Sequence, residues 1–285
     1  MTESNTELDD ARDEIDRIDD QLHDLLRRRA EVVARVGEAK RGTAEAVIRP
    51  GREAAILRRL LERHDGPLPR AVIAGIWRQV IAAMVRLQGP LSVAVCAPQH
   101  SVGYWDLARS HYGVSTPMTL HRSHHVVLRA VDQGESTVGL LPVPQDDDVD
   151  PWWPSLAAAP ARAPRIIARL PFVDPGDGRF EELSALVVAT IDVDETGADV
   201  SLLVAATHTE LSRARLNEYL QSAGLDGGGR AVVRASSSNP EILHLIEISD
   251  FVAKKDRRID DLLALADGNI ERVVRIGGYA APIQH

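Results

Sequence analysis

Residues 11–40 read ARDEIDRIDDQLHDLLRRRAEVVARVGEAK, and this stretch decides the fold of the N-terminal part of the chain. Its apolar residues recur every three or four positions, as on one face of an α-helix. They are Ile15, Ile18, Leu22, Leu25, Val32, Val33 and Val36. The pattern predicts one helix over residues 7–41, about 50 Å long. Such a helix cannot bury its apolar face inside a small single-chain domain, so we expect a partner helix.

Two shorter helices follow this long one. Pro50 is a favoured first-turn residue and predicts the start of the second helix, which the stretch DGPLP (65–69) ends. Apolar residues at helical spacing then predict a third helix over residues 70–88, closed by Gly89 and Pro90. Residues 1–90 are therefore expected to form an all-α domain of three helices.

The remainder of the chain has a different pattern. LSVAVCAP (91–98) and STVGLLPV (136–143) read as buried strands, helices are expected near 101–111 and 123–133, and 145–164 reads as an irregular connection. Residues 91–183 are thus expected to form a reduced α/β region. Later strands at 199–207, 230–236, 241–249 and 271–279, with helices at 209–223 and 256–267, give a ferredoxin-like βαββαβ order over residues 184–285.

Bulk properties exclude several classes of protein. The 285 residues carry a formal net charge of −9, which argues against nucleic-acid binding as the main role. Cys96 is the single cysteine, so no intramolecular disulfide is expected. The polar, acidic start does not read as a signal peptide, and no apolar run reaches the ~20 residues of a membrane span. We expect a cytoplasmic protein that acts neither on membranes nor on nucleic acid.

Cations interrupt the apolar face of the long helix at Arg12, Arg29 and Lys40. A buried cation is costly unless it is paired, although each side chain could also extend its charged end to water. Arg29 and Lys40 are separated by roughly 16 Å along the helix, so their side chains could hold a small dianion between them. Arg12 lies about 25 Å beyond Arg29, so it would reach that ligand only from a second chain in a two-fold dimer.

The other two helices add polar groups to the same interior. Arg52 and Glu53 lie in the first turn of the second helix, where the helix dipole favours anions, and Gln88 continues the apolar face of the third helix. With these residues the chain resembles the all-helical chorismate mutases over residues 7–90. The resemblance is carried by Arg12-x-x-Ile15-x-x-Ile18-Asp19, Leu25-Leu26-x-x-Arg29, Val36-Gly37-x-x-Lys40, Arg52-Glu53 and Gln88.

The resemblance implies the conversion of chorismate to prephenate, a unimolecular rearrangement without metal, nucleophile or redox cofactor. It implies that Arg29, with Arg12 of the other subunit, binds the substrate carboxylates, that Lys40 and Gln88 contact the ether oxygen, and that Arg52 and Glu53 complete the pocket. Arg49 stands where some members carry an acid, and is expected to add a further substrate-binding cation. These residues suit the reaction, since it requires positioning and a fixed charge at the ether oxygen.

The rest of the chain resembles the segment that follows the mutase in bifunctional mutase–dehydratase proteins. LSVAVCAP and residues 123–143 resemble parts of a prephenate dehydratase, while EILHLIEISDF and VVRIGGY resemble an ACT domain. The dehydratase motifs are altered to Gln99-His100-Ser101-Val102 and Ser184-Ala185-Leu186, so no dehydratase activity is expected. The ACT-like region is expected to bind an aromatic amino acid effector or to act as a scaffold or dimerisation module.

Two other functions remain open. An isochorismate-pyruvate lyase shares the helical fold and a cationic pocket, and a non-catalytic regulatory protein would retain the fold alone. Three further motifs are interpreted as structural: His121, His124 and His125 as a solvated helix end without nearby acids, Gly227–Gly229 as a turn, and Ser236–Ser238 as a turn without a base partner. No metal site is expected.

Overall fold

A computed structural model of the chain describes residues 3–42, 45–98, 103–158, 163–174, 183–234 and 241–283. The chain divides into two compact units. The first comprises residues 1–47 with 83–90, and the second comprises residues 48–82 with 91–285. The expected domain boundaries at 90/91 and 183/184 remain predictions.

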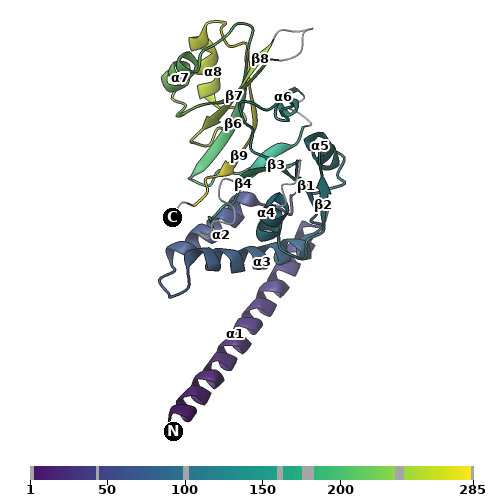
Figure 1. Ribbon diagram of the computed structural model, residues 1–285, viewed down its shortest axis with the longest axis vertical. Coiled ribbons are helices and arrows are strands. Elements are labelled where there is room, and N and C mark those ends of the chain that lie inside the picture. The colour runs from purple at the N-terminus through teal and green to yellow at the C-terminus, as the bar shows by residue number, and fades with distance from the viewer. Residues whose placement is uncertain are drawn as a thin grey trace. The chain divides into compact units, whose positions relative to one another are not determined.

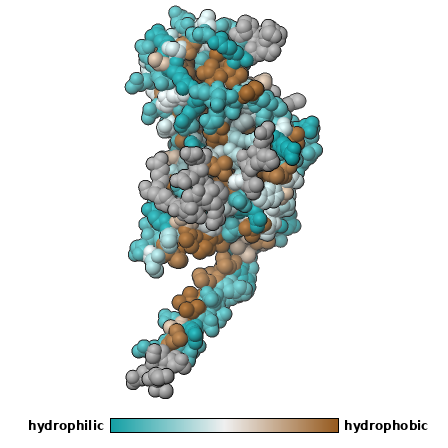
Figure 2. Space-filling view, in the orientation of Figure 1, coloured by the Kyte–Doolittle hydropathy of each residue, from teal (hydrophilic) through white to brown (hydrophobic). Residues whose placement is uncertain are grey.

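The first unit consists mainly of helix α1, Glu3–Lys40, which confirms the long helix predicted from the apolar spacing. Figure 1 shows it as one uninterrupted helix. Much of its apolar face is exposed, and Figure 2 shows apolar residues recurring along it. Ile15, Ile18, Leu22 and Leu25 have exposed fractions of 56%, 47%, 53% and 63%. The single chain therefore leaves much of the apolar face of α1 unburied, as the sequence predicted.

The last turns of helix α3, Arg70–Gln88, complete the first unit. α1 approaches this segment closely at Gly37, which is buried. A Cβ added at Gly37 would lie 3.1 Å from the Cα of Gln88, tighter than most real contacts of this kind. Glycine at this position therefore allows α1 to contact the end of α3, three residues before Lys40 in the sequence.

The second unit begins with helix α2, Pro50–Glu62, as expected. Its inner face buries Ala54, Leu57 and Leu61. The Arg58 guanidinium donates hydrogen bonds to Thr196 Oγ1 (2.9 Å) and to the carbonyl oxygens of Ala198 (2.7 Å) and Ala281 (3.0 Å). α2 is therefore tied to segments more than a hundred residues away in the sequence.

One nine-stranded sheet forms the centre of the described part of the second unit, in the order β2-β1-β3-β5-β4-β9-β6-β8-β7. The strands are β1 Val93–Cys96, β2 Met118–His121, β3 Val138–Pro142, β4 Arg165–Leu170, β5 Ala185–Ala189, β6 Asp199–Thr207, β7 Gly227–Arg234, β8 Ile242–Ile248 and β9 Arg272–Ala280. β1 runs parallel to β2 and β3, and β5 runs antiparallel to β3 and β4. The pair Ile166↔Gly277 joins β4 to β9.

The end of the sheet has the predicted ferredoxin-like arrangement. β6, α7 (Arg213–Ser222), β7, β8, α8 (Arg257–Ala266) and β9 follow one another, and the antiparallel pairs β9-β6, β6-β8 and β8-β7 give the expected strand order. Leu203 and Ile246 of the sheet share one buried cluster with Leu216 and Leu220 of α7 and Leu262 of α8. Both helices thus bury an apolar face against the sheet.

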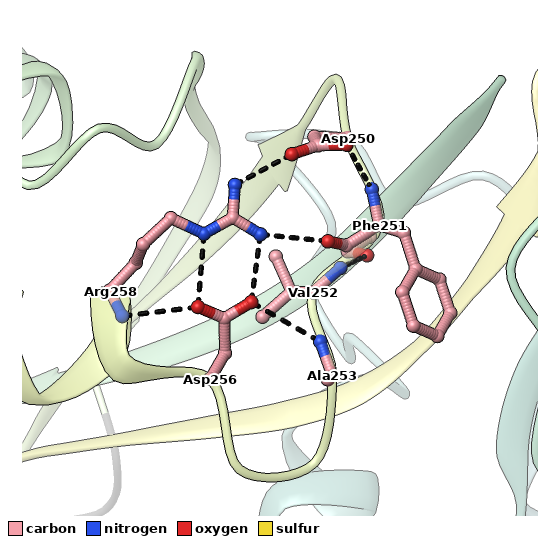
Figure 3. Close-up of polar contacts among 7 residues, drawn as sticks. Asp250, Phe251, Val252, Ala253, Asp256 and Arg258 are labelled. Atoms are coloured by element: carbon pink, nitrogen blue, oxygen red, sulfur yellow. Dashed lines mark hydrogen bonds and ion pairs between the residues drawn. The ribbon is translucent and has the colours of Figure 1, made fainter. Parts of the chain in front are cut away.

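Arg258 fixes the connection between β8 and α8 (Figure 3). Its guanidinium donates to Asp256 Oδ2 (2.7 Å), Asp250 Oδ2 (2.6 Å) and the carbonyl oxygen of Phe251 (2.8 Å). Asp256 also caps α8 by accepting from the Arg258 backbone N–H at 3.0 Å. One side chain therefore orders the loop and the helix start together.

Several predictions need correction. Residues 145–164 contain a short helix, α6 (Pro154–Ala158), which the buried Trp152 and Trp153 precede. Gly227–Gly229 pair with β8 and begin strand β7 instead of forming a turn. Glycine is needed at 227 because a side chain there would collide with the carbonyl oxygen of Glu247 on β8. Strands β2, β4 and β5 were not predicted from the sequence. The motifs at 99–102 and 236–240 lie outside the described residues.

The remaining helices are α4 (Gly103–Tyr112) and α5 (His124–Asp132), both as expected. In the described part of the chain, α3 alone has the length and hydropathy that a membrane span requires. A single helix of this kind is weak evidence, since core helices of soluble proteins pass the same test. Arg78, in the middle of α3, is buried in an ion pair described below.

Candidate active site

The residues proposed for the substrate pocket are divided between the two units. The first unit contains Arg12, Arg29, Lys40 and Gln88. The second contains Arg49, Arg52 and Glu53. Each set is described by itself.

Lys40 lies at the end of α1 and is largely buried, with a side chain 17% exposed. Its Nζ donates to the carbonyl oxygen of Ala46 at 3.2 Å and lies 3.5 Å from Glu45 Oε2. These contacts hold the ammonium group close to the loop that follows α1. The Lys40 ammonium is therefore paired within the chain and not extended into water, and its contact with a substrate remains a prediction.

Arg29 and Gln88 are both half-buried in the first unit. The Gln88 amide donates from Nε2 to the carbonyl oxygen of Met84 at 3.2 Å, which holds the side chain along α3. Gly37 of α1 lies close to Cα, Cβ and Cγ of Gln88, so this residue packs against the last turns of α1. The structure therefore brings Gln88 to the part of α1 that carries Lys40.

Arg12 differs from Arg29 and Lys40 in its exposure. Its side chain is 64% exposed and pairs with Asp9 at 3.1 Å on the surface of α1. An exposed pair of this kind contributes little to stability and is easily exchanged for another anion. This environment agrees with a residue that acts outside its own chain.

Glu53 forms a buried ion pair with Arg78. Arg78 Nη1 donates to Glu53 Oε2 at 3.0 Å, and the two side chains are 8% and 14% exposed. Burial raises the pKa of Glu53, and the charge and hydrogen bond of Arg78 offset part of that rise. Burial likewise lowers the pKa of Arg78, which the Glu53 charge opposes. The carboxylate is thus held in a fixed position.

Arg52 and Arg49 are exposed. Arg49 Nη2 lies 3.1 Å from Asp194 Oδ2. This contact gives Arg49 a partner within the second unit, apart from any substrate. The role of Arg49 as an additional substrate-binding cation remains a prediction.

Sequence reasoning missed Arg78. The signal was present, since Arg78 interrupts the buried positions Ala74, Ile81 and Val85 at helical spacing, as Arg29 does on α1. Arg78 also lines a cavity of about 180 Å³ with His111 and Phe172, and its guanidinium lies 5.3 Å from the Phe172 ring centre. Burial and the Arg78 charge hold the pKa of His111 well below its usual value.

The histidines near α5 also need correction. His124 is largely buried, 16% exposed, while His125 is 58% exposed, so the helix end is only partly solvated. An acid does accompany them, because Asp150 lies within ion-pair distance of both. Burial, and next the neighbouring His125, lower the pKa of His124. The acid is 25 residues away in the sequence, which hid the cluster.

Comparison with known proteins agrees with the helical resemblance. Residues 11–89 match the family described as chorismate mutase type II. A bifunctional chorismate mutase/prephenate dehydratase of Neisseria gonorrhoeae is 35% identical over 121 residues, which is 42% of this chain and 31% of the relative. One from Pseudomonas aeruginosa is 33% identical over 137 residues, or 45% of this chain and 36% of the relative. The match spans about a third of these relatives.

Solved structures are also similar to this chain, with TM-scores below 0.5. A protein described as a novel type of quorum quenching acylase has a TM-score of 0.48 at 11% identity, covering 67% of this chain and 95% of its own. Prephenate dehydratase from Streptococcus mutans has a TM-score of 0.45 at 14% identity, covering 67% and 98%. Residues 11–89, which contain most of α1 together with α2 and α3, are thus the part of the chain that is similar to the chorismate mutase type II family.

Proposed function

We propose that this chain is a chorismate mutase, an isomerase that converts chorismate to prephenate in the biosynthesis of aromatic amino acids. The observation that carries the proposal is the largely buried Lys40 in the same unit as the half-buried Arg29 and Gln88, in a segment that matches the mutase family. Cations held in an apolar environment favour a dianionic substrate. The protein is expected to act in the cytoplasm and to need no cofactor.

In the proposed mechanism the protein positions the substrate and stabilises charge. Arg29, with Arg12 of a second chain, binds the two carboxylates and holds the substrate in a compact conformer. One C–O bond breaks while one C–C bond forms, and negative charge grows on the ether oxygen. The Lys40 ammonium and the Gln88 amide donate hydrogen bonds to this oxygen. Arg52 and Glu53 complete the pocket, with the carboxylate accepting from the ring hydroxyl.

A homodimer is part of the proposal. The exposed apolar face of α1, Ile15 to Leu25, would be covered by α1 of a second copy. The same pairing would bring Arg12 of one chain to Arg29 and Lys40 of its partner. The single chain leaves Arg12 exposed on this helix, which supports a role across an interface.

Dehydratase activity is not expected. Ala185 and Leu186, which take the place of the dehydratase catalytic stretch, are buried in β5 with exposed fractions of 0% and 3%. They pair with Pro142 and Leu141 of β3 in the middle of the sheet. Ala185 and Leu186 have no group that can donate or accept a proton, which leaves the half-buried Ser184 as the polar residue of the altered stretch.

The ferredoxin-like region supports an ACT-like assignment by its strand order. We propose that it responds to an aromatic amino acid or joins two chains. Titration of the mutase rate with phenylalanine and with tyrosine separates these roles, because only an effector site changes the rate at a saturable concentration.

Product analysis tests the main proposal. The purified chain is incubated with chorismate and, separately, with isochorismate. Prephenate formed from chorismate supports a mutase, whereas salicylate and pyruvate formed from isochorismate would instead identify a lyase. Turnover of neither substrate would indicate a regulatory protein. Phenylpyruvate formed from added prephenate would contradict the absence of dehydratase activity.

Mixing variants tests the shared site. Arg12→Ala and Arg29→Ala are expected to be inactive alone, but their mixture should regain about a quarter of the wild-type rate, because half of the dimers would carry one intact site. A mixture of Arg29→Ala with Lys40→Ala should regain nothing, since both residues come from the same chain of each site. If the first mixture stays inactive, the shared site is wrong.

A further inference from the structure

Two adjacent histidines at the start of α5 meet an aspartate from the connection that follows β3. His124 Nε2 lies 3.4 Å and His125 Nε2 lies 3.3 Å from the same oxygen, Asp150 Oδ2. The two imidazole rings are 4.1 Å apart between centres. All three residues belong to the second unit, and none of them is among the residues proposed for the mutase site.

His125 Nε2 also makes a long hydrogen bond of 3.4 Å to Asp150 Oδ1. The distances in the cluster are at the upper limit for hydrogen bonds and suit a shared ion better. A charged imidazole and a carboxylate form hydrogen bonds of about 2.7–2.9 Å, clearly shorter than the contacts observed. Ligand atoms about 2.0–2.1 Å from one tetrahedral metal are instead roughly 3.3–3.4 Å from each other. The three ligand atoms also lie within 4.8 Å of one another, so one ion could contact all of them.

Burial adds an independent observation. His124 Nε2 has no exposed surface and no hydrogen-bond partner. Buried polar atoms are nearly always satisfied, so an atom of this kind needs an explanation. A metal ion at the position shared with Asp150 would supply the partner.

The fold holds both sides of the cluster against the same core. α5 buries Val127 and Val131, while Trp152, two residues after Asp150, is buried and donates from Nε1 to the carbonyl oxygen of Pro142 at 3.0 Å. The ligands therefore lie on segments with limited freedom, and little ordering is needed when an ion binds.

We propose that His124, His125 and Asp150 bind one Zn²⁺ ion through two Nε2 atoms and one carboxylate oxygen, with water at the remaining position. Two imidazoles favour zinc and related first-row transition metals over Mg²⁺ and Ca²⁺, which prefer oxygen ligands. The bound ion links the start of α5 to the segment before α6.

Metal titration of the full chain tests this site. After EDTA treatment and removal of any affinity tag, ZnSO4 is titrated by calorimetry, and Co²⁺ is titrated by visible absorption to report the geometry. One equivalent of Zn²⁺ should bind with an increase in Tm, and Co²⁺ should give the intense bands of a low-coordinate site. Binding of less than one equivalent would overturn the proposal.

Variants identify the ligands. His125→Ala and Asp150→Asn change exposed side chains, so folding should be retained while Zn²⁺ affinity falls by about tenfold or more. The matched changes His23→Ala and Asp147→Asn, at exposed positions outside the cluster, should leave affinity unchanged. Equal affinity in wild type, His125→Ala and Asp150→Asn would show that zinc binds elsewhere and that the assignment is wrong.

Discussion

The Arg78 guanidinium donates to the Glu53 carboxylate at 3.0 Å in a place where both side chains are almost fully buried. Glu53 is also the residue proposed to accept from the ring hydroxyl of the substrate. A fixed carboxylate that already has a cationic partner would retain one oxygen for a substrate while losing little freedom on binding. Arg78 is therefore expected to act on the reaction through Glu53.

Replacing Arg78 should expose the cost of the unpaired carboxylate. Arg78→Leu is expected to lower the free energy of unfolding by about 3–5 kcal/mol, measured by urea denaturation. Without Arg78, burial acts unopposed on Glu53 and raises its pKa further. A carboxyl with a raised folded-state pKa loses stability as pH rises through that value, so the loss should be larger at pH 8 than at pH 5.

A double variant separates the pair from the general effect of mutation. Glu53→Met with Arg78→Leu removes both charges and should recover most of the stability lost in Arg78→Leu. If the losses of the two single variants simply add, the buried pair does not couple the two residues.

A second prediction concerns Gln88. The amide can donate to the ether oxygen at any working pH, whereas a carboxyl group must be protonated to do so. The mutase rate of Gln88→Glu should therefore rise as pH falls toward the pKa of the new carboxyl, while the wild-type rate stays nearly flat. Gln221→Glu, at an exposed position on α7, provides the matched control. A flat profile for Gln88→Glu would count against the proposed role of Gln88.

A third prediction concerns Asp192, in the connection between β5 and β6. Burial raises the pKa of Asp192, but hydrogen bonds from Arg275 (2.7 Å) and Lys254 (3.0 Å) outweigh it and lower this pKa to about 2. A depressed pKa contributes stability above the unfolded value of about 3.8 and loses it as pH falls toward 2. Asp192→Asn should cost about 1–2 kcal/mol at pH 6, and this cost should vanish near pH 2.

Urea denaturation between pH 2 and 6 checks the Asp192 prediction. Asp194→Asn is the control. The Asp194 side chain is 75% exposed, so its ion pair with Arg49 should contribute little to stability. A cost for Asp192→Asn that stays constant over this pH range would exclude the proposed linkage.

Sequence patterns predicted the elements whose apolar residues are regularly spaced. The long α1, the α3 face and the βαββαβ order follow from periodicity within single segments. β2 is short and largely exposed, so its alternation gave little signal. Contacts across the chain left no local pattern: Arg78 with Glu53 and Asp150 with His124 depend on pairings that only the folded chain creates.

The candidate site could be predicted in part for the same reason. Lys40 and Arg29 interrupt an apolar helical face, which is visible in the sequence, and the structure shows both with reduced exposure. The partner of Glu53 was not visible, because it comes from another helix. Whether Arg49 meets a substrate or only Asp194 depends on a long-range contact that spacing cannot report.

A fourth prediction concerns the loop between β8 and α8. Arg258→Ala removes the four hydrogen bonds of the guanidinium that Figure 3 shows, and should lower the free energy of unfolding by about 2–3 kcal/mol. Arg257→Ala is the neighbouring control, since Arg257 is 90% exposed and lies 3.8 Å from Asp261. Similar losses for the two variants, measured by thermal and urea denaturation, would contradict the role of Arg258 in ordering the loop.

The last prediction concerns the exposed face of α1. Leu25 is 63% exposed, so Leu25→Lys should leave the helical content of the single chain unchanged. If α1 of a second copy covers this face, a lysine there would have to be buried between two chains, which is costly. Light scattering should then show a shift from dimer to monomer, and the mutase rate should fall because Arg12 no longer reaches its partner. Asp20→Asn changes the charge equally on the opposite face and should preserve both, whereas a Leu25→Lys chain that remains dimeric and active would exclude this interface.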